Sequence, residues 1–163
     1  MANCHRRNDN EFILISKNSR GCILLDLDVE NRQSLNIKHE YELINLFRDQ
    51  NFEAARLPGA VSRAPDLIAG DGETVFILRV KATGGERIEL FKKHVWDLKR
   101  FSVKLKAKPL LALKYEGQSP WIFTHLSVLE DDGNRFAIGL EEARLKGFKM
   151  NELISNELQQ RLV

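Results

Sequence analysis

Two apolar runs joined by a glycine-rich turn constrain the fold of this chain more than any other stretch. Gly70-Asp71-Gly72 separates Leu67–Ala69 from Thr74–Ala82, and this arrangement is a strong signal for a β-hairpin. Pro65 precedes the first run and has no backbone N–H to give to a sheet. Asp66 is therefore expected at the start of a strand, near an end of the sheet, where side chains from several strands can converge.

The second apolar run carries two basic side chains on one face. A β-strand points successive side chains to opposite sides of its sheet, so residues two apart share a face. One face holds Phe76, Leu78 and Val80, and the other holds Val75, Ile77, Arg79 and Lys81. Arg79 and Lys81 are thus expected on the same side.

Residues 34–50 predict a helix, because apolar residues recur there at helical spacing. The expected stripe consists of Ile37, Tyr41, Leu43, Ile44, Leu46 and Phe47. Glu40 follows Ile37 by three residues and precedes Ile44 by four, which places its carboxylate on the inward face. An unpaired carboxylate is costly in an apolar interior, so Glu40 either has a partner in a site or reaches past the helix to water. Spacing alone does not distinguish these two readings.

The remaining elements complete an α/β pattern. Strands are expected at Phe52–Leu57, Leu110–Tyr115 and Trp121–Thr124, and a last helix at Asn151–Leu162 with Asn151 as its cap. A further helix is expected at residues 88–107. Its inward stripe would be Phe91, Val95, Leu98, Phe101 and Leu105, with Trp96 on its flank. The alternation of helices and strands predicts a central mixed β-sheet flanked by helices.

Residues 1–30 predict an N-terminal extension in which we identify no chemistry. Glu11–Ser16 and Cys22–Val29 are apolar runs separated by a glycine-containing segment, which favours a β-hairpin. An overlong start of the reading frame would look similar. Residues 31–163 would then form the main domain.

Composition narrows the class of protein. The chain has 163 residues, enough for one domain with a substantial core. No apolar run is long enough for a membrane helix and no signal peptide opens the chain, so we expect a cytoplasmic protein without a membrane partner. Its two cysteines suggest neither a disulfide framework nor a zinc site. Residues 84–114 hold nine basic and three acidic side chains, and such a local excess favours an anionic partner.

The hairpin and the first helix together resemble the core of a metal-dependent nuclease. Phosphodiester hydrolysis at such a site uses two or three carboxylates around Mg²⁺ and a nearby lysine that positions the nucleophile or stabilises developing charge. Asp66 and Lys81 suit these roles, and Glu40 could supply another ligand. A Pro-Asp pair followed by x-Lys is a weak signal alone, but its strand–turn–strand context and the inward glutamate make it more specific.

The chain resembles the archaeal Holliday junction resolvases of the PD-(D/E)xK nuclease superfamily, from about Leu35 to the C terminus. Six stretches carry the resemblance: His39–Leu43, Asn51–Ala60, Ala64–Ala69, Val80-Lys81, Leu98–Phe101 and Lys108–Leu113. The resemblance implies a restriction-endonuclease-like core over residues 31–163. It also implies a homodimer that binds four-way DNA junctions and cleaves them with Mg²⁺.

The resemblance implies roles for individual residues. Glu40 matches the helix glutamate, Asp66 the metal-binding aspartate and Lys81 the catalytic lysine. Ala60–Arg63 fall in a loop that approaches the junction, and Ser62 is the candidate for its catalytic serine. Leu35-Asn36 stand where the family usually has a Lys-Gly pair, which removes one phosphate contact.

Arg79 occupies the position of the second metal-binding acid, with its spacing from Asp66 preserved. A guanidinium stays protonated and cannot ligate a cation, but it can pair with a carboxylate. One hypothesis is that Arg79 fills the metal position, so hydrolysis is lost or reduced while DNA binding survives. In the other, a nearby acid has taken over the ligand role in an active endonuclease; the candidates are Glu73, Glu86 and Glu89. The cofactor would be Mg²⁺ in an active enzyme, and none in an inactive paralogue that serves as a DNA-binding or partner-docking subunit.

Junction recognition is expected to rest on shape and phosphate contacts, so basic side chains are the candidates. They are Arg56, Arg63, Lys92, Lys93, Lys99, Arg100 and Lys104. A basic outer helix face is also often just a solvated surface. Recombination or replication proteins are further expected partners.

Overall fold

The computed structural model describes the backbone of residues 5–6, 12–13, 15–18, 21–24, 27–57 and 64–162, and the side chains of residues 37–57 and 64–162. Ser62 and Arg63 lie outside the described residues. The chain divides into two compact units, Met1–Ile37 and Lys38–Val163.

The first unit contains two pairs of short antiparallel strands. β1 (His5–Arg6) pairs with β2 (Phe12–Ile13), and β3 (Ile15–Asn18) pairs with β4 (Gly21–Leu24). Helix α1 (Leu27–Arg48) begins in this unit and ends in the second. The expectation of a strand continuing to Val29 is therefore wrong, since residues 27–29 are helical. A domain boundary after residue 30 stays a prediction.

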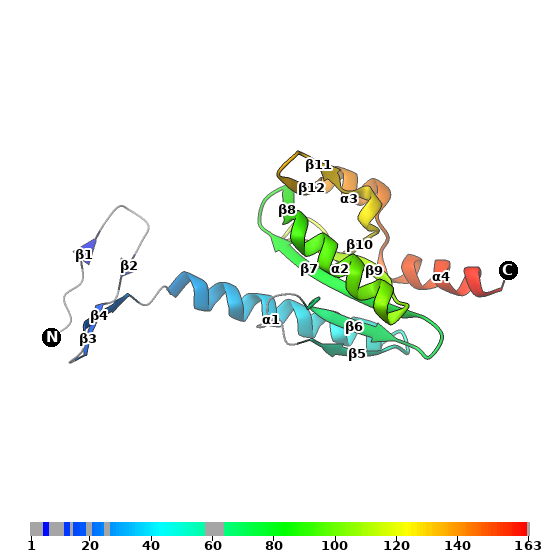
Figure 1. Ribbon diagram of the computed structural model, residues 1–163, viewed down its shortest axis with the longest axis horizontal. Helices are drawn as coiled ribbons and strands as arrows, with labels where there is room; N and C mark the ends of the chain where they lie inside the picture. Colours follow the sequence, from blue (N-terminus) through cyan, green and yellow to red (C-terminus); the bar gives the residue numbers. More distant parts are fainter. Residues whose placement is uncertain are drawn as a thin grey trace. The chain divides into compact units, whose positions relative to one another are not determined.

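The second unit is built on a five-stranded sheet of order β10-β9-β7-β6-β5 (Figure 1). These strands are β5 (Glu53–Arg56), β6 (Leu67–Gly70), β7 (Val75–Thr83), β9 (Lys108–Tyr115) and β10 (Ile122–Thr124). β7 and β9 run parallel and the other neighbours antiparallel, which confirms the predicted mixed sheet. β6 and β7 form the predicted hairpin, and Gly72 adopts a positive φ of 95° in its turn.

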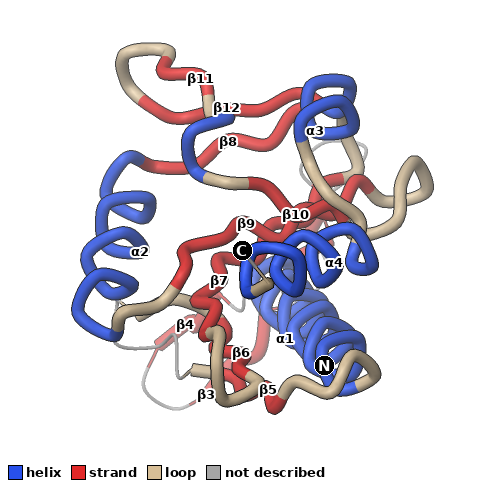
Figure 2. Tube along the Cα trace, turned by 90° about the vertical axis from the view of Figure 1, so that its right-hand side faces the viewer, coloured by secondary structure: helices blue, strands red, loops and turns tan. Residues whose placement is uncertain are grey.

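Helices cover both faces of this sheet (Figure 2). α2 (Lys92–Leu105) packs on one face, where Val95 and Leu98 join Ile77 in a buried cluster. α1 and α4 (Met150–Arg161) pack on the other, where α1 contributes Leu43, Ile44 and Phe47, β7 contributes Phe76 and Leu78, and α4 contributes Leu153. The alternation along β7 thus places Arg79 and Lys81 on the face that α2 covers.

A smaller sheet of order β11-β12-β8 was not predicted. It consists of β8 (Arg87–Phe91), β11 (Glu130–Asp131) and β12 (Arg135–Gly139). A 3₁₀ turn, η2 (Leu126–Val128), precedes β11 in the chain, and helix α3 (Leu140–Lys146) follows β12. The expectation of a helix from residue 88 is wrong, because residues 88–91 belong to β8. Ile88 and Leu90 are buried and alternate with exposed residues, as in a half-buried strand. Their pairing partner, β12, lies more than forty residues away in the sequence, so local periodicity could not reveal it.

Several details of the predicted helices also differ. Ile37 and Tyr41 are exposed, whereas Leu43, Ile44 and Phe47 are buried, so only part of the expected stripe of α1 faces the core. Apolar residues lie on more than one side of this helix, and packing decides which side is inward. Of the inward stripe expected for the second helix, Phe91, which belongs to β8, and Leu105 are likewise exposed.

The cap of α4 is Lys149 rather than Asn151. The backbone N–H of Lys149 donates to the carboxylate of Glu152 at 2.8 Å, which closes a capping box two residues earlier than expected.

Among the helices that the structure describes, none is long and apolar enough to cross a membrane.

Candidate functional site

Asp66 is fixed at the open end of the β6–β7 hairpin. Its backbone N–H donates to the carbonyl of Leu78 at 2.9 Å, and its own carbonyl accepts from Leu57 at 2.9 Å. Asp66 is therefore held between β5 and β7. Its carboxylate turns back on the sheet, where Oδ2 accepts the backbone N–H of Val80 at 2.7 Å. One carboxylate oxygen is thus committed to the backbone.

Arg79 binds the other oxygen of this carboxylate. Its Nη1 donates to Asp66 Oδ1 at 3.0 Å, and its Nη2 donates to the carbonyl of Ala64 at 3.1 Å. The side chains of Arg79 and Asp66 are 12% and 16% exposed, respectively. A charge-assisted hydrogen bond at this depth is shielded from water and is stronger than a surface ion pair. The guanidinium thus lies between the aspartate and the loop carbonyl.

Glu40 is also paired with a guanidinium. Its carboxylate accepts from Nε of Arg56 on β5, and its side chain is only 12% exposed. The hydrogen bond that Arg56 donates to Glu40 raises the pKa of Arg56, and the charge of Asp66 adds to this effect. Arg56 therefore lies close to both carboxylates. Of the two readings of Glu40, the structure favours an inward carboxylate with a partner.

Lys81 and His94 complete the charged cluster. Lys81 is half-buried, and burial lowers the pKa of its ammonium; the positive charge of Arg79 lowers it further, while Asp66 opposes the change. Burial likewise lowers the pKa of His94, and the charges of Arg79 and Lys81 add to this. His94 lies in the first turn of α2, one residue before the buried Val95. His94 was not predicted as a site residue, because nothing in the sequence distinguished it from the basic residues beside it.

The described side chains do not fit a divalent cation at this position. Each candidate carboxylate, Asp66 and Glu40, accepts a hydrogen bond from a guanidinium. Within residues 37–57 and 64–162, no group of three or more His, Cys, Asp and Glu side chains is arranged to hold a metal ion. A fixed positive charge also repels a cation.

The three acids proposed to replace the missing ligand lie elsewhere. Glu73 is in the turn at the other end of the hairpin, where Arg161 binds it at 3.0 Å. Glu89 on β8 pairs with Arg135 at 2.7 Å. Glu86 is exposed just before β8, beside Arg87 and Glu130. The structure brings none of them to Asp66.

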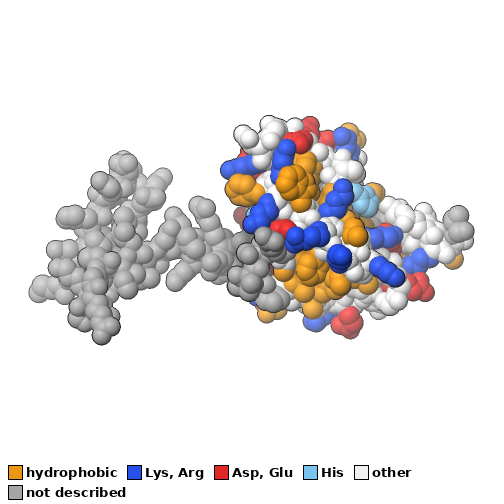
Figure 3. All heavy atoms as spheres, viewed as in Figure 1, with side chains coloured by type: hydrophobic (Ala, Val, Ile, Leu, Met, Phe, Trp, Pro, Cys, Tyr) orange, Lys and Arg blue, Asp and Glu red, His pale blue; other side chains and the backbone are white. Residues whose placement is uncertain are grey.

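Most of the predicted DNA-binding side chains lie on α2. Lys93, Lys99 and Lys104 are exposed. Lys92 pairs with Asp131 at 2.6 Å, and Arg100 pairs with the buried Asp97 at 2.8 Å. Figure 3 shows basic side chains gathered on the face of the molecule that α2 occupies, with hydrophobic side chains between them.

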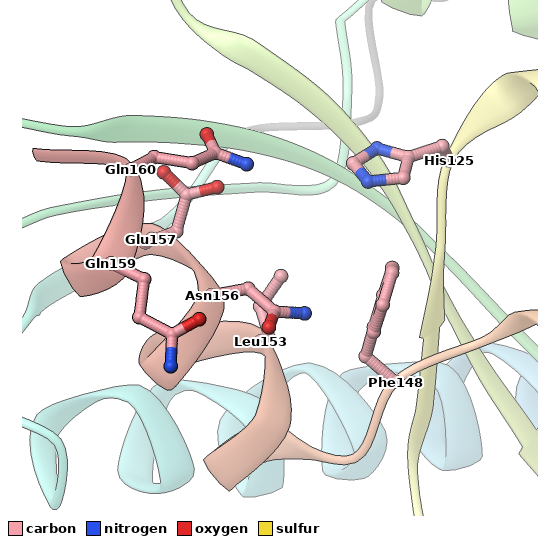
Figure 4. Close-up of a pocket in the computed structure, with 7 residues that line it drawn as sticks. All are labelled: His125, Phe148, Leu153, Asn156, Glu157, Gln159 and Gln160. Atoms are coloured by element: carbon pink, nitrogen blue, oxygen red, sulfur yellow. The ribbon is translucent and has the colours of Figure 1, made fainter. Parts of the chain in front are cut away.

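A separate cavity lies between α4 and the end of β10. Its volume is about 550 Å³, and Figure 4 shows His125 and Phe148 facing the side chains of α4 across it. Its lining comprises His125, Phe148, Leu153, Asn156, Glu157, Gln159 and Gln160. Glu157 is buried and bound by Lys108 at 2.5 Å. None of the predicted site residues lines this cavity.

The sequence and the fold of this chain are similar to those of several known proteins. Residues 31–162 match the family model described as archaeal Holliday junction resolvase. The uncharacterised protein ORF6 of Methanothermobacter thermautotrophicus is 34% identical over 96 residues, which cover 59% of this chain and 75% of that protein. The crossover junction endodeoxyribonuclease Hjc of Methanocaldococcus jannaschii is 30% identical over 99 residues, or 61% and 71% of the two chains. The 1.6 Å structure of the Holliday junction resolvase Hjc of Archaeoglobus fulgidus superposes with a TM-score of 0.67 at 28% identity, covering 72% of this chain and 98% of that one.

The mixed sheet, its flanking helices and the Asp66–Lys81 hairpin define a nuclease-type domain of the restriction-endonuclease-like fold. The chain belongs to the archaeal Holliday junction resolvase family. Proteins of this family are generally metal-dependent nucleases, and the Arg79–Asp66 pair is the feature of this site that needs a functional explanation.

Proposed function

We propose that this protein binds four-way DNA junctions and has lost most or all of the metal-dependent cleavage of its family. The observation that carries the proposal is the hydrogen bond from Arg79 Nη1 to Asp66 Oδ1 at 3.0 Å. The family membership supports junction recognition, and the guanidinium–carboxylate pair argues against a bound Mg²⁺.

The net charge of the site explains how junction binding can persist without metal-dependent cleavage. The cluster of Glu40, Asp66, Arg56, Arg79 and Lys81 contains two carboxylates and three cations. A net positive cluster disfavours a divalent cation but favours the phosphates of DNA. Substitution of an acid by arginine thus removes cation affinity without removing attraction for the polyanion.

The proposal is tested with a synthetic four-way junction and a supercoiled cruciform plasmid. We expect the wild-type protein to bind the junction equally well in EDTA and in Mg²⁺, and to leave the plasmid uncut in Mg²⁺ or Mn²⁺. Binding to linear duplex of the same length serves as the control for structure selectivity. Efficient paired nicking by the wild type would overturn the proposal, and so would equal affinity for the duplex and the junction.

A second candidate function is an active junction-resolving endonuclease with a rearranged site. It is favoured by the retention of Asp66, Lys81 and Glu40, and by relatives that carry the name crossover junction endodeoxyribonuclease. Alanine substitution of Glu73, Glu86 or Glu89 in a cleaving preparation would identify a substitute ligand. The pairing of Glu73 and Glu89 with arginines away from Asp66 makes this the weaker candidate.

We also propose that the protein acts as a homodimer in the cytoplasm, where archaeal DNA lies. The outer face of α2 supports a protein interface, because Trp96 and Val103 are 62% and 72% exposed and lie two helical turns apart. Large apolar side chains grouped on an exposed surface often mark an interaction site. Lys93 and Lys104, on one flank of the helix, would then contact DNA.

A further inference from the structure

The face of β7 under α2 contains more hydrogen-bond donors than acceptors. Arg79 has five N–H groups, of which the described residues accept two, one at Asp66 Oδ1 and one at the Ala64 carbonyl. Its Nε is buried and has no acceptor among the described residues. The side chain of Lys81, two residues further along the same face, makes no hydrogen bond or ion pair with a described residue, although it is half-buried.

His94 adds a third nitrogen-bearing side chain to this region. Its Nδ1 is buried and lacks a partner within residues 37–57 and 64–162. Val95, the next residue, packs with Ile77 on the face of β7 that carries Arg79 and Lys81; burial lowers the pKa of His94, and the charges of both basic residues lower it further. The first turn of α2 contains no acidic residue and has no side-chain cap, so its N-terminal dipole also favours negative charge.

Two carboxylates act on these groups, Asp66 and Asp97 of α2, and Asp97 is paired with Arg100 at 2.8 Å. Asp66 accepts one hydrogen bond on each oxygen, from Arg79 and from the backbone of Val80, and no hydrogen bond or ion pair among the described residues joins it to Lys81. Buried donors without acceptors cost stability, and a ligand rich in acceptor oxygens removes that cost. The excess of donors and of positive charge matches a phosphate group and does not match a cation.

We propose that Arg79 and Lys81, backed by His94, form a metal-independent phosphate-binding site at the position where a nuclease of this fold would hold its cation. The ligand is a phosphate oxyanion, supplied by the backbone of bound DNA. This inference rests on the proposed junction binding for the source of the phosphate. The site itself depends only on the geometry around Asp66.

The site is tested by nuclear magnetic resonance on the full chain, with inorganic phosphate and junction DNA as separate probes. The Nε–H signal of Arg79 is assigned by its disappearance in Arg79→Lys. We expect it to shift and saturate with either probe in EDTA, but not with chloride at equal ionic strength. A shift with phosphate but not with junction DNA would assign the site to a free phosphate-containing ligand and overturn its role in DNA binding. No shift with either probe would overturn the site.

The junction affinity supplies a second readout. The slope of log affinity against log salt falls by about 0.9 for each lost phosphate contact. Lys81→Gln is therefore expected to weaken binding at low salt, and its affinity ratio to the wild type should change by about 3.5-fold between about 50 and about 200 mM salt. His94→Gln should weaken binding without changing the slope, because it removes no full charge.

Lys146→Gln is the matched control, since Lys146 is an exposed lysine on α3 that pairs with Glu142. Its salt slope should equal that of the wild type. If Lys81→Gln and Lys146→Gln have the same slope while the wild type still binds the junction, the phosphate site is refuted and the proposed function stands. If the wild type does not bind the junction, the proposed function fails, and the inorganic phosphate experiment still decides the site.

Discussion

Replacing Arg79 by glutamate should convert a stable, metal-insensitive protein into a less stable, metal-responsive one. The Arg79–Asp66 pair is largely buried, with 12% and 16% of the side chains exposed. Breaking a buried pair by removing one partner costs about 3–5 kcal/mol, because the remaining charge is left without compensation. Arg79→Glu goes further, since it places a second carboxylate beside Asp66. In EDTA we therefore expect the midpoint of thermal unfolding to fall by roughly 10 °C or more.

A divalent cation should restore part of this loss. A ligand present at about 100 times its Kd stabilises the folded state by about 2.7 kcal/mol, which is roughly 8 °C for a chain of this size. The wild type should show no comparable response to Mg²⁺ or Mn²⁺, because the guanidinium binds the carboxylate that a cation would need. The same Arg79→Glu preparation should gain nicking of a cruciform plasmid.

The assay is thermal unfolding in EDTA and in increasing Mg²⁺, with Arg79→Gln as the matched control. Arg79→Gln also removes the ion pair but adds no carboxylate, so it should be destabilised without gaining the full metal response. The reasoning is refuted if the wild type is stabilised by Mg²⁺ as strongly as Arg79→Glu. It is also refuted if Arg79→Glu in EDTA is as stable as the wild type.

Three further predictions concern the rest of the fold. Joint substitution of Trp96 and Val103 by aspartate should leave the unfolding temperature nearly unchanged but convert a dimer to a monomer in analytical ultracentrifugation; a dimer that persists would exclude this face. Burial raises the pKa of Asp71, but hydrogen bonds from the turn backbone and from an arginine outweigh burial and lower it below its ordinary 3.8. The stability that ionised Asp71 contributes is thus present above about pH 4 and is lost as the pH falls through the lowered pKa of the folded state. Denaturant titrations at decreasing pH should therefore show a shrinking difference in stability between the wild type and Asp71→Asn. Tyr115→Phe should cost about 1–2 kcal/mol in urea unfolding, because it leaves the buried carbonyl of Ile138 without the hydroxyl that donates to it at 3.1 Å.

The sequence by itself determined the central hairpin and its chemistry. A Gly-Asp-Gly turn between apolar runs predicted the β6–β7 hairpin, and the two-residue period of β7 placed Arg79 and Lys81 on one face. Glu40, the Pro65-Asp66 pair and Arg79 were likewise recognised from residue types at fixed spacing. These features depend on local geometry, which short-range patterns encode well.

Only the tertiary structure showed which partners these charged side chains bind. Whether Arg79 binds Asp66 depends on how β6 lies against β7, and whether Glu40 has a partner depends on Arg56 of β5 lying under α1. The strand β8 was mistaken for the start of a helix because its partner β12 is distant in the sequence. His94 joined the site because α2 covers the face of β7 that carries Arg79 and Lys81.

The difference has one physical cause. Turns, strand periodicity and residue chemistry are set by neighbours along the chain, whereas the partner of a buried charge is set by packing between elements that are far apart in it. The sequence therefore predicted a nuclease core in which arginine stands at the position expected for an acid. The tertiary structure showed that this arginine donates a hydrogen bond to Asp66, on the face of β7 that also carries Lys81 and that α2 covers.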